Sequence, residues 1–254
     1  MSGIKKVKRD VVIITGASGG IGRGLSKAFA NAGWAVLGID RDYSENEHLA
    51  KQITLDLAEV FRDKIQLDLL TDAIAGELES CNRLVLVNNA AVQILSGMKD
   101  VTLNDLETSM RINAFVPVLL SQYLLLLAPE EFTMIVNIGS IHSTQSKRGF
   151  LPYAISKSGL DGVTRAMSLE IGDKVKVCGV RPAAIATDML IAGFGENKSL
   201  LSELRSYHPS KSIGEIADVG KLVLALVNLE FSFINGAVIN LDGGISHVLH
   251  DPNG

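Results

Sequence analysis

The segment Val11-Val12-Ile13-Ile14-Thr15-Gly16-Ala17-Ser18-Gly19-Gly20-Ile21-Gly22 joins an apolar, mostly β-branched run to a glycine-rich turn. Residues 21–32 follow with apolar side chains at helical spacing, and Gly33 is a helix stop signal. The stretch therefore predicts a buried strand, a tight turn and a helix in direct succession. The first turn of such a helix offers unpaired N–H groups and a partial positive charge, which suits a pyrophosphate.

Strand-like and helix-like stretches alternate along the rest of the chain. Six more short apolar runs cover residues 35–39, 52–55, 84–87, 134–138, 175–180 and 237–240, and helical spacing covers 57–79, 102–128, 153–171 and 215–226. Continuously apolar strands between helices are typical of a parallel sheet that is covered on both faces. We therefore predict an α/β protein with a three-layer, doubly wound Rossmann fold and a seven-stranded parallel sheet.

The sequence offers no boundary at which this fold would divide. No linker rich in Pro, Gly or Ser interrupts it, so residues 1–254 are interpreted as a single Rossmann-type domain in which residues 1–10 form a basic N-terminal lead-in. The one long irregular stretch, 187–213, contains Gly193, Gly195, Asn197 and Pro209. Loops of this length in compact domains are usually functional, so we expect loop and helical segments here that bind the substrate.

Composition argues against several functional classes. Hydrophobic residues make up 47% of the 254 residues, which is enough for a large core, and the net charge of -4 disfavours a dedicated nucleic-acid binder. Two cysteines cannot form a disulfide framework, and no cluster of His, Cys and carboxylates has metal-ligand spacing. The most apolar segment, 114–128, is shorter than the ~20 residues of a membrane span. No signal-peptide-like apolar segment follows the lead-in, so we expect a cytoplasmic protein without metal or membrane partners.

Tyr153 and Lys157 are the first candidates for catalysis. They lie four residues apart at the start of a predicted helix, so both side chains project from one face. A free tyrosine has a pKa near ~10, and a lysine ammonium within a few Å favours the phenolate and lowers that pKa. The pair is therefore suited to act as a general acid/base on an alcohol oxygen. Tyr207 and Lys211 have the same spacing, but Pro209 between them disfavours a shared helix face.

Other polar residues stand where the predicted elements bring them to the same site. Asp40 ends the second predicted strand, eighteen residues after Gly22, where a carboxylate accepts hydrogen bonds from an adenosine ribose. Ser140 follows the fifth predicted strand, and a hydroxyl there can hold a substrate oxygen. Asn113 sits inside a predicted helix and is either a satisfied buried amide or part of a kink that holds a water. His142 is interpreted as a residue that lines the pocket or is exposed to solvent rather than as a second acid/base.

In their order along the chain, these motifs resemble the short-chain dehydrogenase/reductase family, in the compact branch whose chains are about as long as this one. The likeness runs from the first predicted strand to Gly244. The turn 15–22 looks like the family's cofactor motif, Asn88-Asn89-Ala90-Ala91 looks like its Asn-Asn-Ala-Gly motif, and Leu241-Asp242-Gly243-Gly244 resembles its terminal motif. Asn113, Ser140, Tyr153 and Lys157 match the family's catalytic tetrad one for one.

The resemblance implies an NAD(P)-dependent dehydrogenase/reductase that transfers a hydride between the dinucleotide and a small secondary alcohol or ketone, with Tyr153 as general acid/base. It also implies that Lys157 holds the nicotinamide ribose, that Asn113 fixes a water that relays protons, and that a homotetramer or homodimer forms through helices 102–128 and 153–171. The implied cofactor-binding residues are Gly16, Ser18, Gly20, Ile21, Gly22, Asp40, Arg41, Asp56, Leu57, Asn89, Ala90, Tyr153, Lys157, Pro182, Ile185 and Thr187.

The chain departs from the family's pattern in three places. Ala91 stands where Gly is usual, and Ala183-Ala184 follows Pro182 where Pro-Gly is usual. Only fifteen residues separate Asp40 from Asp56, so the helix between the second and third strands is expected to be short or missing.

Two questions about function stay open at the level of the sequence. Asp40 favours NAD, because the 2′-phosphate of NADP would meet a like charge, whereas Arg41 next to it is a partner for that phosphate. The alternative to an enzyme is a dinucleotide-sensing or scaffold protein on the same fold. Such proteins tend to lose a member of the tetrad, and all four are present here, so we favour the enzyme.

Overall fold

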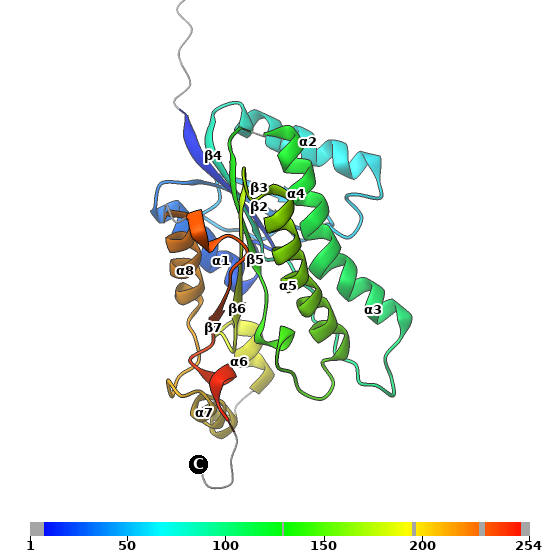
Figure 1. The fold of residues 1–254 in the computed structure, drawn as a ribbon, viewed down its shortest axis with the longest axis vertical. Coiled ribbons are helices and arrows are strands. Elements are labelled where there is room, and N and C mark those ends of the chain that lie inside the picture. Colours follow the sequence, from blue (N-terminus) through cyan, green and yellow to red (C-terminus); the bar gives the residue numbers. More distant parts are fainter. Residues whose placement is uncertain (1–7, 129, 195–196, 229–231, 250–254) are drawn as a thin grey trace, which may run out of the picture.

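The computed structural model describes residues 8–128, 130–194, 197–228 and 232–249, and its centre is a sheet of seven parallel strands (Figure 1). The strands are β1 (Arg9–Thr15), β2 (Ala35–Asp40), β3 (Lys51–Thr54), β4 (Cys81–Asn88), β5 (Phe132–Ile138), β6 (Lys176–Pro182) and β7 (Val238–Leu241). Their order is β3-β2-β1-β4-β5-β6-β7, and every pairing is parallel. The predicted doubly wound sheet is confirmed. Residues 1–7 of the predicted lead-in lie outside the described residues.

Helices cover both faces of the sheet, which gives three layers (Figure 1). On one face, α1 (Gly20–Asn31) packs against α8 (Ile216–Asn228). The other face is covered by α2 (Lys64–Leu78), α3 (Leu103–Met110), α4 (Val116–Leu127) and α5 (Leu151–Ile171). Two short helices, α6 (Asp188–Phe194) and α7 (Lys198–Tyr207), lie beyond the carboxyl ends of β6 and β7. In folds of this kind that end of the sheet is where ligands bind.

Successive residues of β1 point into two different cores. Val11 and Ile13 belong to a core that includes Leu120 of α4, on one face of the sheet. Val12 and Ile14 belong to a second core, which includes Leu25 and Phe29 of α1, on the other face. A strand that is buried on both faces has to be apolar at every position, which is why its sequence shows no alternation.

One helical region differs from the sequence-based expectation. α2 begins at Lys64 rather than at residue 57, because Asp63 caps it with a side-chain oxygen that accepts from Ile65 N at 2.8 Å. Residues 57–62 form turns instead. The stretch 187–213, where loop and helical segments were expected, contains α6 and α7. Between β2 and β3 the described residues form no helix, as the short spacing predicts.

The predicted helix 102–128 is made of three segments. α3 starts with a capping box between Thr102 and Asp105. A π-helical turn, Arg111–Phe115, then separates α3 from α4 and contains Asn113. Single π-helical turns often mark functional sites, because the widened turn redirects side chains and backbone groups. The irregularity of the helix at this polar residue takes the form of a π-helical turn.

By length and composition alone, the stretch Leu103–Leu127 would be sufficient to cross a membrane, and 39% of its most apolar window is buried inside the protein. A helix that packs on a sheet passes the same test. Val116, Leu120 and Leu124 of this stretch belong to the core beneath the sheet face that it covers. Its apolar character is thus explained in part by packing within the chain.

Candidate active site

The glycine turn connects β1 to α1, and two of its glycines are required by the geometry of the turn itself. Gly16 has φ +66°, in the left-handed region, and an added Cβ would lie 2.9 Å from Ala90 Cα. A Cβ on Gly22 would lie 2.1 Å from Gly16 O. Among the described residues no side chain caps α1, and its first turn holds no acidic residue. The N–H groups at this end are therefore available to an anion.

Asp40 ends β2 and faces the glycine turn. Its Oδ2 accepts from the backbone N of Ser18 at 2.9 Å, and its Oδ1 accepts from Arg41 N at the same distance. The Arg41 side chain is exposed, and its Nε lies 3.1 Å from Asp42 Oδ2. The carboxylate of Asp40 is thus held beside the turn, while the guanidinium next to it is paired with a different acid.

Asn89 and Thr15 hold the glycine turn against the end of β4. Asn89 Nδ2 donates to the carbonyl oxygens of Thr15 and Gly16, each at 3.0 Å. Thr15 Oγ1 accepts from the backbone N of Asn89 and of Ala90, also at 3.0 Å. The Asn-Asn-Ala segment therefore braces the turn directly. Ala91, which replaces the expected glycine, is exposed, so its methyl group meets no crowding from the core.

The segment that follows β6 closes over the same turn. A Cβ on Gly20 would lie 2.8 Å from Thr187 Cγ2, which places this threonine against the start of α1. Pro182 ends β6, and the buried Ile185 pairs with Gly214 in a short parallel bridge that fixes the backbone leading to Thr187. Asp56 and Leu57 follow β3, at the far side of the sheet from β6, and of the two only Leu57 is buried.

Ser140, Tyr153 and Lys157 meet at the carboxyl end of β5. Ser140 lies two residues beyond this strand, and its hydroxyl forms a hydrogen bond with Tyr153. Lys157 Nζ lies 5.8 Å from the centroid of the Tyr153 ring and donates to Ile138 O at 2.8 Å. Tyr153 and Lys157 occupy successive turns of α5, so they share a face as the spacing predicts.

Burial controls the pKa of both ionisable members of this cluster. The pKa of Tyr153 is raised because its phenol is buried, and the hydrogen bond with Ser140 offsets this only in part. This direction is opposite to the lowering that the Tyr–Lys spacing predicts. Burial lowers the pKa of Lys157 from 10.5 to about 8, and the nearby carboxylate of Asp161 acts against that change.

Asp161, which pairs with Arg181, supports the cluster and was missed by the sequence analysis. Arg181 Nη2 lies 2.9 Å from Asp161 Oδ2, and both side chains are largely buried. Asp161 therefore balances two cations, Lys157 on its own helix and Arg181 on β6. The sequence feature that could have indicated Asp161 is its spacing, because it lies four residues after Lys157 and therefore on the same face of α5.

The side chain of Asn113 is fully engaged in holding a loop to α5. Its Oδ1 accepts from Val92 N at 2.8 Å, and its Nδ2 donates to Val92 O and to Ser156 Oγ, each at 2.9 Å. Ser156 lies directly before Lys157 on α5. Asn113 thus ties the loop after β4 to the helix that carries the tyrosine and the lysine, which matches the interpretation as a satisfied buried amide.

A buried chain of polar side chains joins β4 and β5 to α5 behind the cluster. Asn88 Nδ2 donates to Asn137 Oδ1 at 2.8 Å, and Asn137 Nδ2 donates to Thr164 Oγ1 at 2.9 Å. Asn88 Oδ1 has no hydrogen-bond partner among the described residues. The sequence feature that could have indicated these hydrogen bonds is Asn137, a lone amide inside an apolar strand. Because buried amides require partners, the chain fixes how α5 sits on the sheet.

His142, Phe150 and Tyr153 form an aromatic group beside Ser140. The His142 and Phe150 rings stack with their centroids 4.5 Å apart, and each meets the Tyr153 ring edge-on, at 5.8 and 6.3 Å. Lys147 Nζ lies 4.5 Å from the Phe150 centroid. Burial lowers the pKa of His142, and the Lys147 ammonium adds to this effect. Both causes favour the neutral imidazole as a wall of the site.

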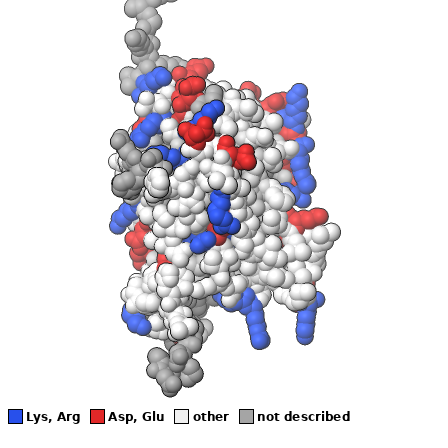
Figure 2. All heavy atoms as spheres, viewed as in Figure 1, with Lys and Arg blue, Asp and Glu red and all other residues white. Residues whose placement is uncertain are grey.

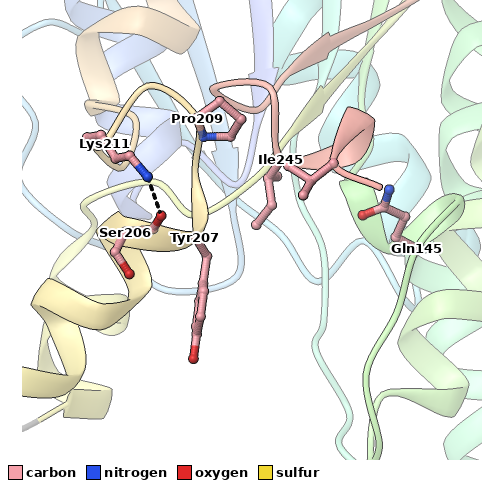
Figure 3. A pocket seen from close by; sticks show the side chains of 7 residues that line it. Gln145, Ser206, Tyr207, Pro209, Lys211 and Ile245 are labelled. Carbon is pink, nitrogen blue, oxygen red and sulfur yellow. Dashed lines mark hydrogen bonds between the residues drawn. The ribbon is translucent and has the colours of Figure 1, made fainter. Parts of the chain in front are cut away.

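A pocket of about 820 Å³ lies between the loop after β5 and the end of α7 (Figure 3). Gln145 lies on one side of it and Tyr207 on the other. α7 ends at Tyr207, and Lys211 follows in a turn with φ 55°, so these two residues do not share a helix face, as Pro209 predicts. The lining consists of Gln145, Ser206, Tyr207, Pro209, Lys211, Ile245 and Val248.

Within the described ranges, no group of three or more His, Cys, Asp or Glu side chains is placed to hold a metal ion. Cys81 and Cys178 are free and buried. Burial raises the pKa of each thiol to about 11. Thiols of this kind stay protonated near neutral pH and react poorly as nucleophiles.

The chain matches the sequence family described as Enoyl-(Acyl carrier protein) reductase over residues 16–246. It is 29% identical to the 3-oxoacyl-[acyl-carrier-protein] reductase FabG of Pseudomonas aeruginosa, over 92% of this chain and 96% of that protein. It is also 29% identical to D-erythrulose reductase of Gallus gallus, over 91% and 94%.

Solved structures show the same fold over nearly the full length. The ligand-free aldohexose dehydrogenase of Thermoplasma acidophilum superposes with a TM-score of 0.85 at 25% identity, covering 96% of this chain and 98% of that one. ElxO with NADP bound superposes with a TM-score of 0.82 at 25% identity, covering 94% and 100%. Together with the family match, this likeness shows that the chain belongs to the short-chain dehydrogenase/reductase family.

Proposed function

We propose that the protein is an oxidoreductase that transfers a hydride between NAD(P) and a secondary alcohol or ketone, with Tyr153 as general acid/base. The observation that carries this proposal is the cluster at the end of β5, where a hydroxyl, a phenol and a buried ammonium lie together. The names of the relatives, which are reductases and a dehydrogenase, support the same class of reaction. The glycine turn lies at the same edge of the sheet, where ligands of parallel sheets bind.

The residues around the glycine turn fit a dinucleotide. The uncapped start of α1 suits the pyrophosphate, and the Asp40 carboxylate stands at the strand end where ribose hydroxyls are bound in such folds. Bound there, the nicotinamide supplies or accepts the hydride. We propose NAD rather than NADP, because Asp40 would repel a 2′-phosphate and Arg41 is paired with Asp42. ElxO, a relative of similar fold, has NADP bound, so the fold by itself does not decide the choice.

The chain's own residues handle the proton. Ser140 donates a hydrogen bond to the substrate oxygen and so stabilises the charge that develops there. Tyr153 gives its phenolic proton to that oxygen when a ketone is reduced, and removes the proton when an alcohol is oxidised. Because burial raises the pKa of Tyr153, the phenol of the cofactor-free protein carries the proton that a ketone oxygen would receive. Lys157, close to the ring, places a positive charge where the phenolate forms.

Asn113 acts in this scheme as a positioning residue. Its amide spans from Val92 to Ser156 and thereby holds the loop after β4 against the first turns of α5. Because Ser156 and Lys157 are neighbours, a shift of this loop would also move the ammonium relative to the phenol. Asn113 therefore sets the spacing on which proton transfer depends.

We propose that the substrate enters through the pocket between residues 141–150 and 187–213. Its lining combines apolar side chains such as Ile245 with the amide of Gln145 and the ammonium of Lys211. This mixture suits a medium-sized, partly apolar substrate that carries polar groups.

We also propose that the protein assembles as a homodimer or homotetramer through α3, α4 and α5. Leu126 at the end of α4 is 77% exposed, and Leu169 near the end of α5 is 87% exposed. Apolar side chains concentrated on two neighbouring helices are typical of a surface that a second subunit covers.

The direct test of the proposed reaction is the Tyr153→Phe variant, assayed with NADH and a panel of ketones. We expect kcat to fall at least about a hundredfold, while NADH binding, measured by its fluorescence, stays unchanged. Tyr123→Phe is the matched control, because Tyr123 lies on α4 away from the cluster. Wild-type protein that binds NADH without turning over any ketone would support the sensor or scaffold alternative, and full activity of Tyr153→Phe would overturn the proposed mechanism.

A further inference from the structure

A second pocket, of about 610 Å³, lies on the other side of the loop that follows β5. Gln145 of this loop faces the pocket shown in Figure 3, whereas the next four residues, 146–149, line the second pocket. Residues 97–100 of the loop after β4 form the opposite wall, and Leu151 and Ala154 of α5 complete the lining. A parallel bridge between Ser96 and Phe150 holds the two loops together.

The second pocket is strongly positive. Lys99, Lys147 and Arg148 line it against a single acidic residue, Asp100. Among the described residues none of these three cations has an ion-pair partner within 4.0 Å. Figure 2 shows positive side chains that project from the lower edge of the molecule, below α3 and α5, with no acidic side chain visible beside them. In a chain whose net charge is -4, this unpaired positive charge is a local exception.

Lys147 connects the second pocket to the catalytic cluster. Its Nζ lies 4.5 Å from the Phe150 centroid, and that centroid lies 6.3 Å from the centroid of Tyr153. The distance from the Lys147 ammonium to the centroid of the Tyr153 ring is therefore no longer than the sum of these two distances. Its charge also reaches His142, whose pKa it helps to lower. A group bound at Lys147 is thus within the length of one small molecule from the site of proton transfer.

We propose that the second pocket binds an anionic group, a carboxylate or a phosphate, and that this group belongs to the substrate whose oxygen is held by Ser140 and Tyr153. Arg148 is suited to such a group because a guanidinium binds carboxylate and phosphate oxygens through two parallel hydrogen bonds. Lys99 and Lys147 add two further charges. The anion site is inferred from the charge and the lining of the pocket. The assignment of the bound anion to the substrate rests on the proposed function.

The first experiment measures anion binding without any enzyme assay. Inorganic phosphate is titrated calorimetrically, at fixed ionic strength, into the wild-type chain, into the double variant K147Q/R148Q and into K221Q. Lys221 is the matched control, because it is an exposed lysine on α8 in the opposite layer. Phosphate that binds at the start of α1 contributes equally in all three proteins, so the difference between them reports on the second pocket.

We expect the second pocket of wild type to give a saturable component in the phosphate titration. In K147Q/R148Q the apparent affinity of this component should be at least about tenfold weaker. K221Q should bind like wild type. Identical titrations for all three proteins would overturn the proposal. Unchanged circular dichroism of the double variant shows that the effect is local, and both replaced side chains are exposed, so no core contact is lost.

The second experiment decides where the anion comes from. Oxo acids in which several methylene groups separate the ketone from the carboxylate, such as 7-oxooctanoate, and their methyl esters offer the same ketone with and without a carboxylate, and they are long enough to reach from Tyr153 towards Lys147. We expect K147Q/R148Q to raise KM for the acids by about three- to tenfold and to leave KM for the esters unchanged. If the ratio of KM for the acids to KM for the esters is the same in K147Q/R148Q and in wild type, the assignment to the substrate is overturned. The pocket is then a site for a free anion. If wild type reduces neither class, the proposed function fails, and the phosphate titration alone decides the anion site.

Discussion

Replacing Lys157 with Met should reveal that the catalytic ammonium lowers the stability of the fold. Lys157 is 2% exposed, and burial lowers its pKa from 10.5 to about 8. In the unfolded chain the ammonium returns to water and to its ordinary pKa. The gap between 10.5 and about 8 corresponds to about 3 kcal/mol of unfolding free energy, at about 1.4 kcal/mol for each pKa unit.

The sign follows from the number of protons that each state binds. Between pH 8 and pH 10.5 the unfolded chain keeps a proton on Lys157 that the folded protein has lost, so the free energy of unfolding rises with pH. The penalty is fully present below about pH 8 and disappears as the pH approaches 10.5. Tyrosines and other lysines titrate in this range as well, but they do so in both proteins. The quantity of interest is therefore the difference between wild type and K157M.

The assay is urea denaturation of the cofactor-free proteins at a series of pH values from 7 to 10.5. We expect the stability of wild type relative to K157M to increase by about 3 kcal/mol over this range. The variant K221M is the control, because Lys221 is exposed on α8 and its replacement should give a difference that does not change with pH. A flat difference for K157M as well would show that the ammonium is solvated in the folded protein, and the argument from burial would be wrong.

Two further predictions concern the cofactor and the assembly. NADH should have a KM at least about tenfold below that of NADPH, because Asp40 repels the 2′-phosphate. The Asp40→Ala variant should bring the two KM values closer together. A preference of the wild-type protein for NADPH would contradict the assignment. Sedimentation velocity at micromolar concentration should show a dimer or tetramer, and Leu126→Glu together with Leu169→Glu should shift it towards the monomer, because both side chains would be charged in a buried contact. A monomeric wild type would refute the proposed interface.

The strands could be predicted from the sequence because each of them is defined by a local pattern. β1 contains the unbroken apolar run Val11–Ile14 and β5 contains Met134–Val136, and such runs are typical of strands that are covered on both faces. The glycine turn and the Tyr153–Lys157 spacing are also local, so the residues of the candidate site could be named from the sequence. The structure brings Ser140, Tyr153 and Lys157 together at one strand end.

The two helices within 187–213 differ in how much signal the local sequence gives. α6 has only seven residues and contains Gly193, so neither length nor propensity indicates a helix. α7 did carry a signal, because Asn197 caps it with an oxygen that accepts from Leu200 N at 3.3 Å. The sequence analysis therefore expected loop and helical segments in this stretch without placing either helix.

Interactions between distant segments explain the remaining differences. The ion pair of Asp161 with Arg181 joins residues on α5 and β6, and the partners of Asn113 lie on a loop and on another helix. The direction of the Tyr153 pKa depends on how deeply the phenol is buried, which spacing along one helix does not determine. Sequence spacing identifies which groups meet, whereas burial decides their protonation.

The glycines of the turn carry less information about a cofactor than their number suggests. Gly16 is required by its positive φ, Gly22 by the carbonyl of Gly16, and Gly20 by the side chain of Thr187. These three are explained by how the chain packs on itself, with or without a ligand. A Cβ on Gly19, in contrast, would meet Gly16 O only at 3.6 Å, an ordinary contact. The case for a dinucleotide therefore rests on the groups that packing leaves available, which are the N–H groups at the start of α1 and the carboxylate of Asp40.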